Sequence, residues 1–217
     1  MCGRYAMYTH PSAVHAYFSI TRQMPNWAAR YNVAPTQDAP VVVDHGEGRV
    51  IEMKRWWLVP SWSKEPGSKY PMFNARAETL REKPSFKGPF EKRRCIVPAD
   101  GFYEWTGPKN DRVPHFIQQA DGGLLGFAGL YDVWKSRDGT ETVNSFTIIV
   151  TSANDWMSRI HDRMPVILEP GDFDIWLKGT PDTAATLLRP AANDLLKERI
   201  VSKSVNAAKN EGPELIV

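Results

Sequence analysis

Seventeen prolines are spread along the whole chain of 217 residues, and they limit its possible folds more than any other feature does. Proline has no backbone N–H and disfavours a helical conformation in the residue before it. A chain punctuated in this way favours many short elements over long helices. Segments rich in β-branched and aromatic residues lie between the prolines, so most of these short elements are expected to be strands.

Strand and helix signals occupy different parts of the chain. Six segments have the composition and the flanking turn residues of strands: 49–59, 94–97, 101–106, 115–119, 124–131 and 145–151. Helical patterns lie toward the two ends, at residues 11–20, 154–159, 171–178 and 182–189. Residues 120–123 predict a hairpin turn, since their two glycines accept a positive φ. The pattern predicts an α+β fold with a barrel-like, mostly antiparallel β-sheet and short peripheral helices.

The composition is that of an ordinary globular protein. Hydrophobic residues make up 42% and charged residues 24%, which excludes the disordered and fibrous classes. No repeat and no linker-like run of glycine, serine or proline divides the chain. We therefore expect a single domain over residues 1–217.

Cysteine content and hydropathy predict a cytoplasmic protein. Cys2 and Cys95 are too few for a disulfide framework, which favours a reducing compartment. The longest apolar stretch, residues 124–131, has eight residues, whereas a membrane span needs about 20. No apolar segment follows Arg4 and His10, so neither a secretory signal nor a membrane partner is expected.

Basic and aromatic residues gather in one part of an almost neutral chain. The formal net charge is only +2, which by itself indicates no polyanionic partner. Residues 81–94 nevertheless contain six basic and two acidic residues, and they are preceded by Arg76, Trp56, Trp57 and Trp62. A charge run is more often a solvated surface, and clustered tryptophans are more often core. Their combination suits single-stranded nucleic acid, because aromatic rings stack on bases and cations neutralise phosphates.

Cys2 has the most distinctive potential chemistry. Its small side chain permits removal of the initiator Met1, after which the chain would begin with a 1,2-aminothiol. Reference pKa values of about 7.7–8.0 for the amine and about 8.5 for the thiol leave both groups partly nucleophilic at neutral pH. The amine can form a Schiff base with an aldehyde, the thiol can close on the imine carbon to give a thiazolidine, and Arg4 would place a cation beside the electrophile. The alternative is that Cys2 is an incidental residue next to the start codon.

Glu104, His161 and Asn74 could assist such chemistry, although each also has a structural interpretation. Glu104 lies in an aromatic strand-like run, where desolvation would favour acid–base work, or it is the solvent-facing residue of an alternating strand. His161 follows a predicted helix and suits proton transfer, although a lone histidine is more often structural. Asn74 and Arg76 occupy alternating positions, so both could point the same way from an extended segment.

No metal or cofactor site is predicted. The five histidines show no ligand spacing with one another or with either cysteine. The chain also has no phosphate-binding glycine motif and no G-x-S-x-G nucleophile motif. We therefore expect neither a metal nor a cofactor.

Seven segments, taken in order along the chain, carry a resemblance to a known family. They are residues 1–5 (MCGRY), 30–35 (RYNVAP), 60–62 (PSW), 73–79 (FNARAET), 94–105 (RCIVPADGFYEW), 149–151 (IVT) and 160–165 (IHDRMP). With this series the chain resembles the SOS response-associated peptidase (SRAP) family, the abasic site processing proteins. The resemblance implies a mixed α/β domain built on antiparallel sheet, which is compatible with the fold expected above.

The resemblance also implies a function. A protein of this kind binds single-stranded DNA at abasic sites, links itself covalently to the lesion and shields it in the DNA damage response. By this likeness Cys2 supplies both nucleophiles, Glu104 moves protons during Schiff-base formation and ring closure, His161 assists opening of the sugar ring, and Asn74 holds the N-terminal residue or the sugar. Removal of Met1 would be autocatalytic or the work of an aminopeptidase.

A DNA-binding set follows from the same likeness. The matching residues are Arg4, Arg76 and Arg163 at positions that grip phosphates, Trp105 and Thr151 beside them, and Trp62 near the DNA path. We expect a monomer that is nucleoid-associated when it is bound to DNA. Two positions depart from the family pattern: Trp57 replaces a small residue, which predicts a bulkier groove floor, and Thr106 replaces a lysine, with Lys109 as the nearest cation.

Two other functions remain open from the sequence. The first is a thiol peptidase acting on peptides in trans, with Cys2 as nucleophile, His161 as base and Asn74 or Glu104 as the orienting group. The second is a binding module without covalent chemistry. A peptidase would turn over steadily and would not need the α-amine, whereas capture of an aldehyde occurs once for each molecule.

Overall fold

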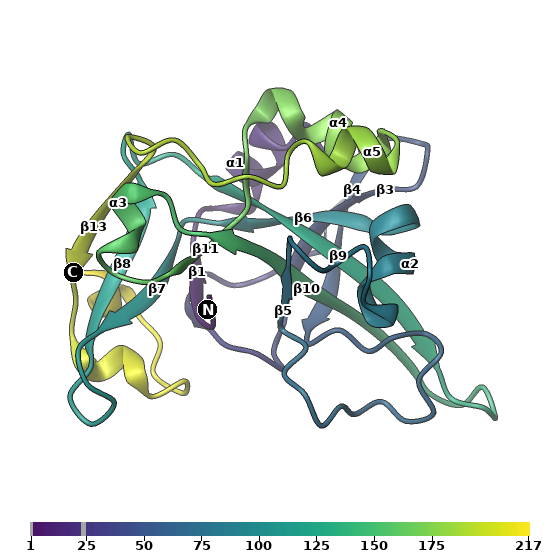
Figure 1. Cartoon of the computed structure of the whole chain (residues 1–217), viewed down its shortest axis with the longest axis horizontal. Helices are drawn as coiled ribbons and strands as arrows, with labels where there is room; N and C mark the ends of the chain where they lie inside the picture. Colours follow the sequence, from purple (N-terminus) through teal and green to yellow (C-terminus); the bar gives the residue numbers. More distant parts are fainter. Residues whose placement is uncertain (1, 23–24) are drawn as a thin grey trace.

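The strands form two sheets in the computed structural model, which describes residues 2–22 and 25–217 (Figure 1). The smaller sheet is antiparallel and has the spatial order β13-β8-β7-β1-β2. Its strands are β1 (Tyr5–Met7), β2 (Arg30–Val33), β7 (Gly101–Thr106), β8 (Val113–Gln119) and β13 (Leu196–Ile200). Because β1 lies between β2 and β7, the N-terminal segment is held by two distant parts of the chain.

The larger sheet is barrel-like. Its strands are β3 (Asp38–Asp44), β4 (Arg49–Trp56), β5 (Asn74–Arg76), β6 (Arg94–Ala99), β9 (Leu125–Lys135), β10 (Thr142–Ser152), β11 (Arg163–Pro165) and β12 (Ile167–Leu168). Pairing runs through β10, β4, β3, β6 and β9, and β9 pairs in turn with β10. The pairings of β10 with β4 and β5 are parallel, and the other pairings are antiparallel. The predicted α+β class is thus confirmed.

Short helices surround the sheets. They are α1 (Pro11–Tyr17), α2 (Pro84–Lys92), α3 (Asp155–Ser158), α4 (Phe173–Lys178) and α5 (Pro181–Ala185), with 3-10 helices η1 (Pro170–Asp172), η2 (Lys203–Asn206) and η3 (Pro213–Ile216). Figure 1 shows α1, α4 and α5 together along the upper edge of the molecule. In the part of the chain that the structure describes, no helix combines the length and the apolarity needed to span a membrane.

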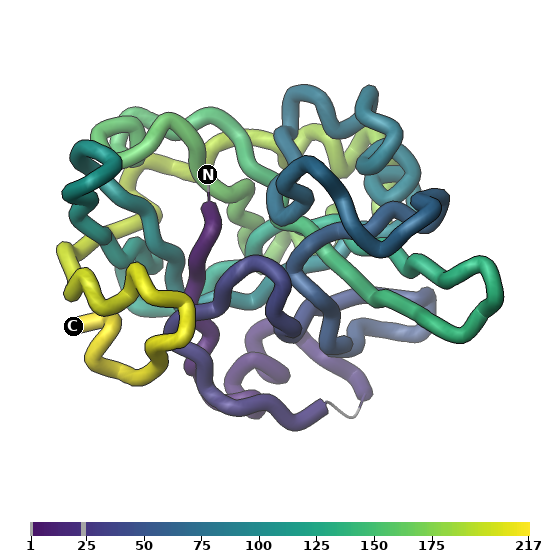
Figure 2. Tube along the Cα trace, turned by 90° about the horizontal axis from the view of Figure 1, so that it is seen from below, coloured from purple at the N-terminus to yellow at the C-terminus, as the bar shows by residue number. Residues whose placement is uncertain are grey.

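Strand β7 separates two hydrophobic cores because successive side chains point to opposite faces of a sheet. Phe102 and Ile117 belong to the main core, which the larger sheet completes. Tyr103 and Phe116 belong to a smaller core that includes Leu215 near the C-terminus. Figure 2 shows how the C-terminal segment (yellow) comes to lie beside the N-terminal strand (purple). The two ends of the chain therefore build one region of the molecule.

The predicted elements overlap observed ones, with shorter helices. Each of the six predicted strand segments overlaps a strand, and residues 101–106 match β7 over its full length. The first helix was expected to reach residue 20 but ends at Tyr17. It cannot continue because Ser19 has a positive φ of 51°, which lies outside the helical range. The predicted helix at 182–189 is likewise reduced to α5.

One expectation from the sequence is wrong, and two elements of the structure, β3 and α2, were not expected. Residues 120–123 form a turn in which Gly122 has a φ of 84°, but the predicted hairpin is wrong, since β8 and β9 belong to different sheets. Strand β3 was not predicted because Pro40 ordinarily argues against a central strand. Helix α2 was not predicted because it contains Gly88 and Pro89, although the burial of Phe90 holds it in place.

Candidate functional site

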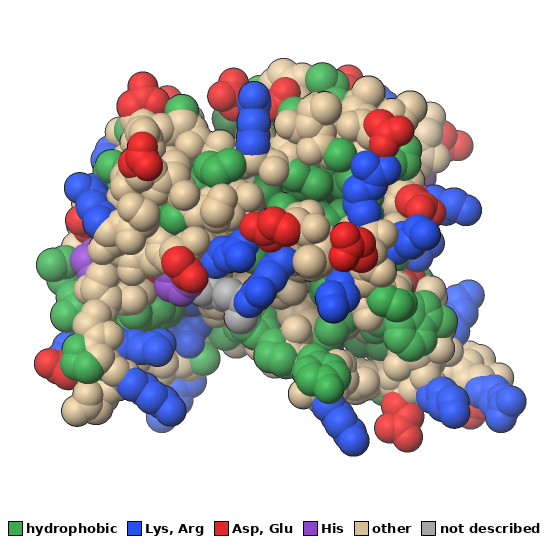
Figure 3. Space-filling model, in the orientation of Figure 1, with side chains coloured by type: hydrophobic (Ala, Val, Ile, Leu, Met, Phe, Trp, Pro, Cys, Tyr) green, Lys and Arg blue, Asp and Glu red, His purple; other side chains and the backbone are tan. Residues whose placement is uncertain are grey.

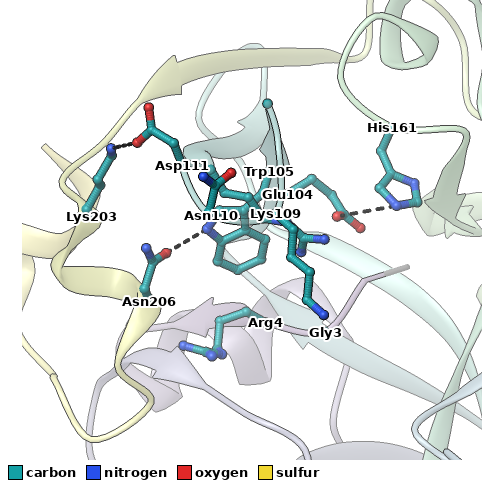
Figure 4. A pocket seen from close by; sticks show the side chains of 12 residues that line it. Gly3, Arg4, Glu104, Trp105, Lys109, Asn110, Asp111, His161, Lys203 and Asn206 are labelled. Atoms are coloured by element: carbon teal, nitrogen blue, oxygen red, sulfur yellow. Dashed lines mark hydrogen bonds and ion pairs between the residues drawn. The ribbon is translucent and has the colours of Figure 1, made fainter.

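One cleft of about 540 Å³ contains four of the predicted site residues (Figure 4). It opens between β7, the β7–β8 loop, the segment after α3 and the 3-10 helix η2. Its lining residues are Gly3, Arg4, Glu104, Trp105, Gly107, Lys109, Asn110, Asp111, Arg112, His161, Lys203 and Asn206. Both ends and the middle of the chain thus contribute to one site.

Glu104 is buried at this cleft because of the alternation along β7. It lies on the same side of the strand as Phe102, which packs in the main core, whereas Tyr103 and Trp105 face the smaller core. Glu104 is only 3% exposed. Burial disfavours the charged carboxylate and raises the pKa of Glu104 to about 7. The structure therefore supports the desolvated carboxyl group rather than the solvent-facing one.

His161 faces Glu104 across the cleft. Its Nε2 atom lies 3.9 Å from Oε2 of Glu104. Its Nδ1 atom accepts a hydrogen bond of 3.0 Å from the backbone N–H of Arg163 and also lies 2.9 Å from Oδ1 of Asp162. These two contacts require opposite protonation of Nδ1, and the backbone contact defines the resting state because the Asp162 side chain is 86% exposed. Burial lowers the pKa of His161, which favours the same neutral form with its proton on Nε2.

Cys2 lies in the main core beside the cleft. It is 0% exposed and precedes β1 directly. Burial, and after it the nearby charge of Glu104, raises the pKa of the Cys2 thiol well above its usual range. The thiol is therefore protonated at neutral pH and needs a base before it can attack. Gly3, the next residue in the chain, lines the cleft together with Glu104.

Asn74 is the first residue of β5 and does not line the cleft. It is in register with Ile148 of the parallel strand β10, and its Nδ2 atom donates a long hydrogen bond of 3.4 Å to the Ile148 carbonyl. Its Oδ1 atom is buried and accepts no hydrogen bond from the described residues. A buried acceptor of this kind is costly unless a donor satisfies it, so this atom is available to a donor that enters the site.

Arg4 supports the wall of the cleft. Its Nη1 atom donates to Oδ1 of Asn32 and to the carbonyl of Val205, both at 2.7 Å. Asn32 is completely buried, and its amide donates to the carbonyls of Val205, Ala207 and Asn210. Burial lowers the pKa of Arg4. The predicted phosphate contact of Arg4 would therefore involve a side chain that also fastens the C-terminal segment.

The C-terminal residues that form one wall of the cleft could not be predicted from the sequence. Nε1 of Trp105 donates a 2.7 Å hydrogen bond to Oδ1 of Asn206, and Nζ of Lys203 lies 2.5 Å from Oδ1 of Asp111. No motif marks Lys203 or Asn206, and only their approach in space makes them part of the site. Lys109, in contrast, is the cation noted near the departure at position 106, and it lines the same cleft.

Arg76, Thr151 and Arg163 lie together at one end of β10. Strands β5 and β11 both pair with β10, where Arg76 is in register with Val150 and Arg163 with Ser152, the two neighbours of Thr151. Arg76 is exposed and Thr151 is buried. Arg163 forms an ion pair with Glu78. Burial opposes ionisation of Glu78, but hydrogen bonds, among them that from Arg163, outweigh it and lower the pKa of this carboxyl group.

The clustered tryptophans have different environments. Trp56 is completely buried, and Trp57 is half-buried against Phe73 with ring centroids 5.8 Å apart. Trp62 is 65% exposed and lines a second groove rather than the cleft. The tryptophan cluster is thus partly core and partly surface. The core interpretation holds for Trp56, and Trp62 has the exposure that base stacking requires.

Three of the six basic residues in the run at 81–94 are engaged within the protein, whereas Lys83, Lys87 and Lys92 are exposed. Arg81 pairs with Asp182 at 2.7 Å, and Arg93 pairs with the buried Asp132 at 3.1 Å. Arg94 is buried, and its guanidinium donates to backbone carbonyls that include that of Trp176. These residues stabilise the packing of α2 and α4 on the larger sheet. These three arginines therefore have a structural role in the fold.

Both cysteines are free and buried. Burial raises the pKa of the Cys95 thiol to about 12. Cys95 belongs to β6 within the core and lines no cleft that contains acid–base groups. Among the described residues, no group of three or more histidine, cysteine, aspartate or glutamate side chains is placed to hold a metal ion.

A sheet-based domain with Cys2 in the core, directly before a cleft that holds a buried carboxyl group and a histidine, defines a particular class of protein. The family model described as SOS response associated peptidase (SRAP) matches residues 1–208. The chain therefore belongs to the SRAP family, as the seven segments indicate.

Relatives cover nearly the whole chain. A Bacillus subtilis protein named abasic site processing protein YoqW is 41% identical over 223 residues, which cover 100% of this chain and 99% of that protein. The protein named abasic site processing protein HMCES of Xenopus tropicalis is 34% identical over 262 residues, which cover 99% of this chain and 77% of that protein. A crystal structure of a protein from Bacteroides thetaiotaomicron has a TM-score of 0.86 and 25% identity, with 99% of this chain and 98% of that one covered.

Proposed function

We propose that this protein recognises abasic sites in single-stranded DNA and captures them covalently through Cys2 once Met1 has been removed. The names of the relatives support the lesion as the target. The observation that carries the chemistry is Glu104, a buried carboxyl group with a pKa of about 7 that faces His161 and whose charge raises the pKa of the Cys2 thiol. Such a group can both give and take a proton at neutral pH.

The first covalent step uses the amine. An abasic sugar equilibrates with an open-chain aldehyde, and the α-amine of Cys2 adds to its carbonyl carbon to give a carbinolamine. Protonated Glu104 donates its proton to the carbinolamine hydroxyl, which leaves as water, and a C=N iminium forms. The raised pKa of Glu104 matters here because an ordinary glutamate would have no proton to give at pH 7.

The second step uses the thiol. The Glu104 carboxylate left by the first step accepts the proton of the Cys2 thiol, whose own pKa is too high for spontaneous ionisation. The sulfur then forms a C–S bond to the iminium carbon and closes the thiazolidine ring. Overall, one aldehyde and one aminothiol give one thiazolidine and one water, and Glu104 returns to its protonated state. A single carboxyl group therefore serves both steps.

His161 and Asn74 act before and around these steps. Neutral His161 carries its proton on Nε2, directed at the cleft, and donates a hydrogen bond to the ring oxygen when the closed sugar opens. The proton of the anomeric hydroxyl passes to the ring oxygen through solvent, so His161 stays neutral and no proton is gained or lost overall. The buried Oδ1 atom of Asn74 offers an acceptor for the new α-amine or for a sugar hydroxyl.

Strand binding is assigned to the surface around the cleft. Arg76 is exposed beside Thr151 and is free to approach a phosphate, and Trp105 presents an aromatic ring within the cleft. An abasic site lacks a base, so the sugar can be reached without the cost of flipping one out. The protein acts as a monomer in this proposal, and each molecule captures one lesion.

The decisive experiment measures a stable adduct. Incubation with single-stranded DNA that carries one abasic site is expected to give a species that survives heat and denaturant, and intact DNA is expected to give none. Cys2→Ala is expected to abolish it, and Cys2→Ser to give at most a labile imine. Cys95→Ala is the matched control, because it alters the other buried cysteine and is expected to keep the adduct. Equal adduct yields from Cys2→Ala and the parent would overturn the proposal.

The state of the N-terminus is tested separately by the mass of the purified chain. Loss of Met1 must precede the adduct, because an acylated nitrogen cannot form the Schiff base. The alternative of a thiol peptidase in trans would use the same Cys2 thiol with His161 as the base, but it would not need a free α-amine. Steady turnover of a peptide by this protein would favour that alternative.

A further inference from the structure

One wall of the cleft carries an exposed carboxylate, although the strand proposed to bind there is a polyanion. Among the described residues that line the cleft, Glu104 and Asp111 are the two with carboxyl groups. Glu104 is buried and its pKa is raised to about 7, so it is partly protonated at neutral pH. Asp111 is exposed, and the hydrogen bond and the charge of Lys203 lower its pKa. Asp111 therefore places a full negative charge on the surface of the cleft.

Asp111 is paired with a cation of the same cleft. Its Oδ1 atom lies 2.5 Å from Nζ of Lys203, and the two side chains are 69% and 59% exposed. Figure 4 shows this pair on the other side of the view from His161. An ammonium group binds a phosphate oxygen through the same kind of charge-assisted hydrogen bond. The Asp111 carboxylate therefore occupies the position on Lys203 that a phosphate group would take.

The loop between β7 and β8 fixes the position of Asp111. Residues 107–112 join the two strands, and Gly107 has a φ of 86°. A Cβ atom at this glycine would lie 2.9 Å from the carbonyl oxygen of Asp111, so the loop returns close to its own start. The backbone N–H of Asp111 donates a hydrogen bond of 2.9 Å to the carbonyl of Pro108. The loop thus folds back on itself and presents Asp111 to the C-terminal wall.

Lys203 begins η2, a short helix that is anchored to the rest of the wall. Val205 packs in the smaller core, and its carbonyl accepts a 2.7 Å hydrogen bond from Nη1 of Arg4. Oδ1 of Asn206 accepts a 2.7 Å hydrogen bond from Nε1 of Trp105. These contacts fix the backbone of η2, while the exposed Lys203 ammonium can exchange one anion for another.

Two further cations, Lys109 and Arg112, line the cleft from the same loop as Asp111. Figure 3 shows basic side chains exposed at the lower left, where Figure 1 places the β7–β8 loop and the C-terminal segment. While Asp111 is paired with Lys203, their charges cancel, and the wall presents two cations rather than three. The ion pair therefore sets how strongly this wall attracts a polyanion.

We propose that Asp111 determines specificity by occupying Lys203 as an internal substitute for phosphate, which limits the reversible binding of undamaged single-stranded DNA. Undamaged nucleotides far outnumber lesions, so tight reversible binding would hold the protein on intact strands. A lesion is captured covalently in the proposed function, and a covalent bond does not depend on one phosphate contact. The inference rests on the proposed function, because it concerns the strand that the same cleft receives.

A phosphate that binds Lys203 should add almost nothing to the salt dependence of binding while Asp111 competes with it. An exposed ion pair contributes little stability, so a phosphate can displace the carboxylate. The phosphate then releases a counterion, but the freed carboxylate takes up a cation from solution. Without an acidic partner, one lysine adds about 0.7 to the slope of log Kd against log salt for a single strand. The slope therefore distinguishes a masked lysine from a free one.

The test measures dissociation constants for undamaged single-stranded DNA by fluorescence anisotropy at several salt concentrations. Asp111→Asn frees Lys203 and is expected to bind about fivefold tighter than the parent, with a slope of log Kd against log salt that is steeper by about 0.7. In the Lys203→Gln background the same substitution has no cation to free. There it is expected to change Kd by less than about twofold, since salt screens the more distant charges.

Asp174→Asn is the matched control, because it breaks another exposed ion pair, with Arg49 on the far side of the fold, and is expected to keep the parent affinity. Equal affinities of Asp111→Asn and the parent overturn the inference. An equal gain in the Lys203→Gln background also overturns it, since Asp111 would then repel the strand directly. The proposed function has a separate readout: absence of a stable adduct between the parent and an abasic strand counts against that function alone.

Discussion

The cleft around Glu104 and the second groove, which Trp62 lines, each combine a tryptophan with charged side chains, but they differ in how far these side chains are buried. Glu104 is 3% exposed and its pKa is raised to about 7, because water cannot solvate its charge. Trp62 is 65% exposed, and the cations beside it lie in solvent. Burial thus turns an ordinary carboxyl group into a proton donor, and exposure leaves rings and charges available to a polyanion. The cleft should respond to pH, and the exposed surface to salt.

Glu104→Gln tests the chemical side of this comparison and has the largest expected effect. The amide keeps the size of the side chain but cannot transfer a proton, so the rate of adduct formation should fall by about 10²–10⁴-fold. Affinity for an intact strand should be nearly unchanged. Single-turnover gel assays give the rate, and Glu91→Gln, on the exposed face of α2, is the control. A loss of affinity with an unchanged rate of adduct formation would show that Glu104 binds DNA instead of transferring protons.

Asn32→Ala tests how firmly the buried wall of the cleft is held. The substitution leaves three C-terminal carbonyls without their amide donor and removes the acceptor of Arg4. Unfolding free energy should fall by about 3 kcal/mol, since unsatisfied buried groups are costly. Urea denaturation measures the loss, and Asn110→Ala on the exposed loop should change it little. Equal unfolding free energies of the two variants would show that the hydrogen bonds of Asn32 contribute no more to stability than a residue in a surface loop.

The raised pKa of Glu104 also predicts a pH dependence of stability. The folded state holds this proton up to about pH 7, whereas the unfolded chain loses it near its ordinary value of 4.5. Folded protein therefore binds more protons between these values, and stability falls as pH rises through this window. The parent should lose about 2 kcal/mol more than Glu104→Gln between pH 4.5 and pH 8. Thermal denaturation of both proteins checks this, and parallel curves would contradict it.

Arg76→Ala tests the exposed side and has the smallest expected effect. Affinity should fall by about fivefold for intact and abasic strands alike, because a phosphate contact does not distinguish them. The slope of log Kd against log salt should fall by about 0.7, the value for one cation on single-stranded DNA. Arg189→Ala, another exposed arginine, is the control for fluorescence anisotropy titrations. A loss confined to abasic strands would place Arg76 at the lesion instead.

Local patterns in the sequence predicted six of the thirteen strands in the described residues, because the physical cause of these six is local. β-branched and aromatic residues favour an extended backbone. For residues 101–106 the predicted strand has the same first and last residues as β7. Prediction was wrong for the hairpin at 120–123, since a turn does not determine whether its two strands share a sheet. It missed β3 and α2, where burial in the core overrides the unfavourable Pro40, Gly88 and Pro89.

The candidate site was predictable only in part. Cys2, Glu104 and His161 could be selected because thiol, carboxyl and imidazole groups have the required chemistry wherever they lie. Their approach, with Nε2 of His161 at 3.9 Å from Glu104, joins residues far apart in the chain and leaves no local pattern. The partners of two arginines could not be predicted from the sequence. Arg4 contacts Asn32 and Arg163 contacts Glu78, and both contacts depend on how the chain packs.

The sequence by itself determined the reactive groups of this protein, its short elements and its membership of the SRAP family. Because side chains alternate along a strand, Glu104 and Trp105 of β7 had to point to opposite faces of the sheet, whichever residues pack on those faces. Only the tertiary structure decided which face was closed to water. That choice sets the pKa of Glu104, because the free energy of a charge depends on the atoms that surround it, and those atoms come from every part of the chain.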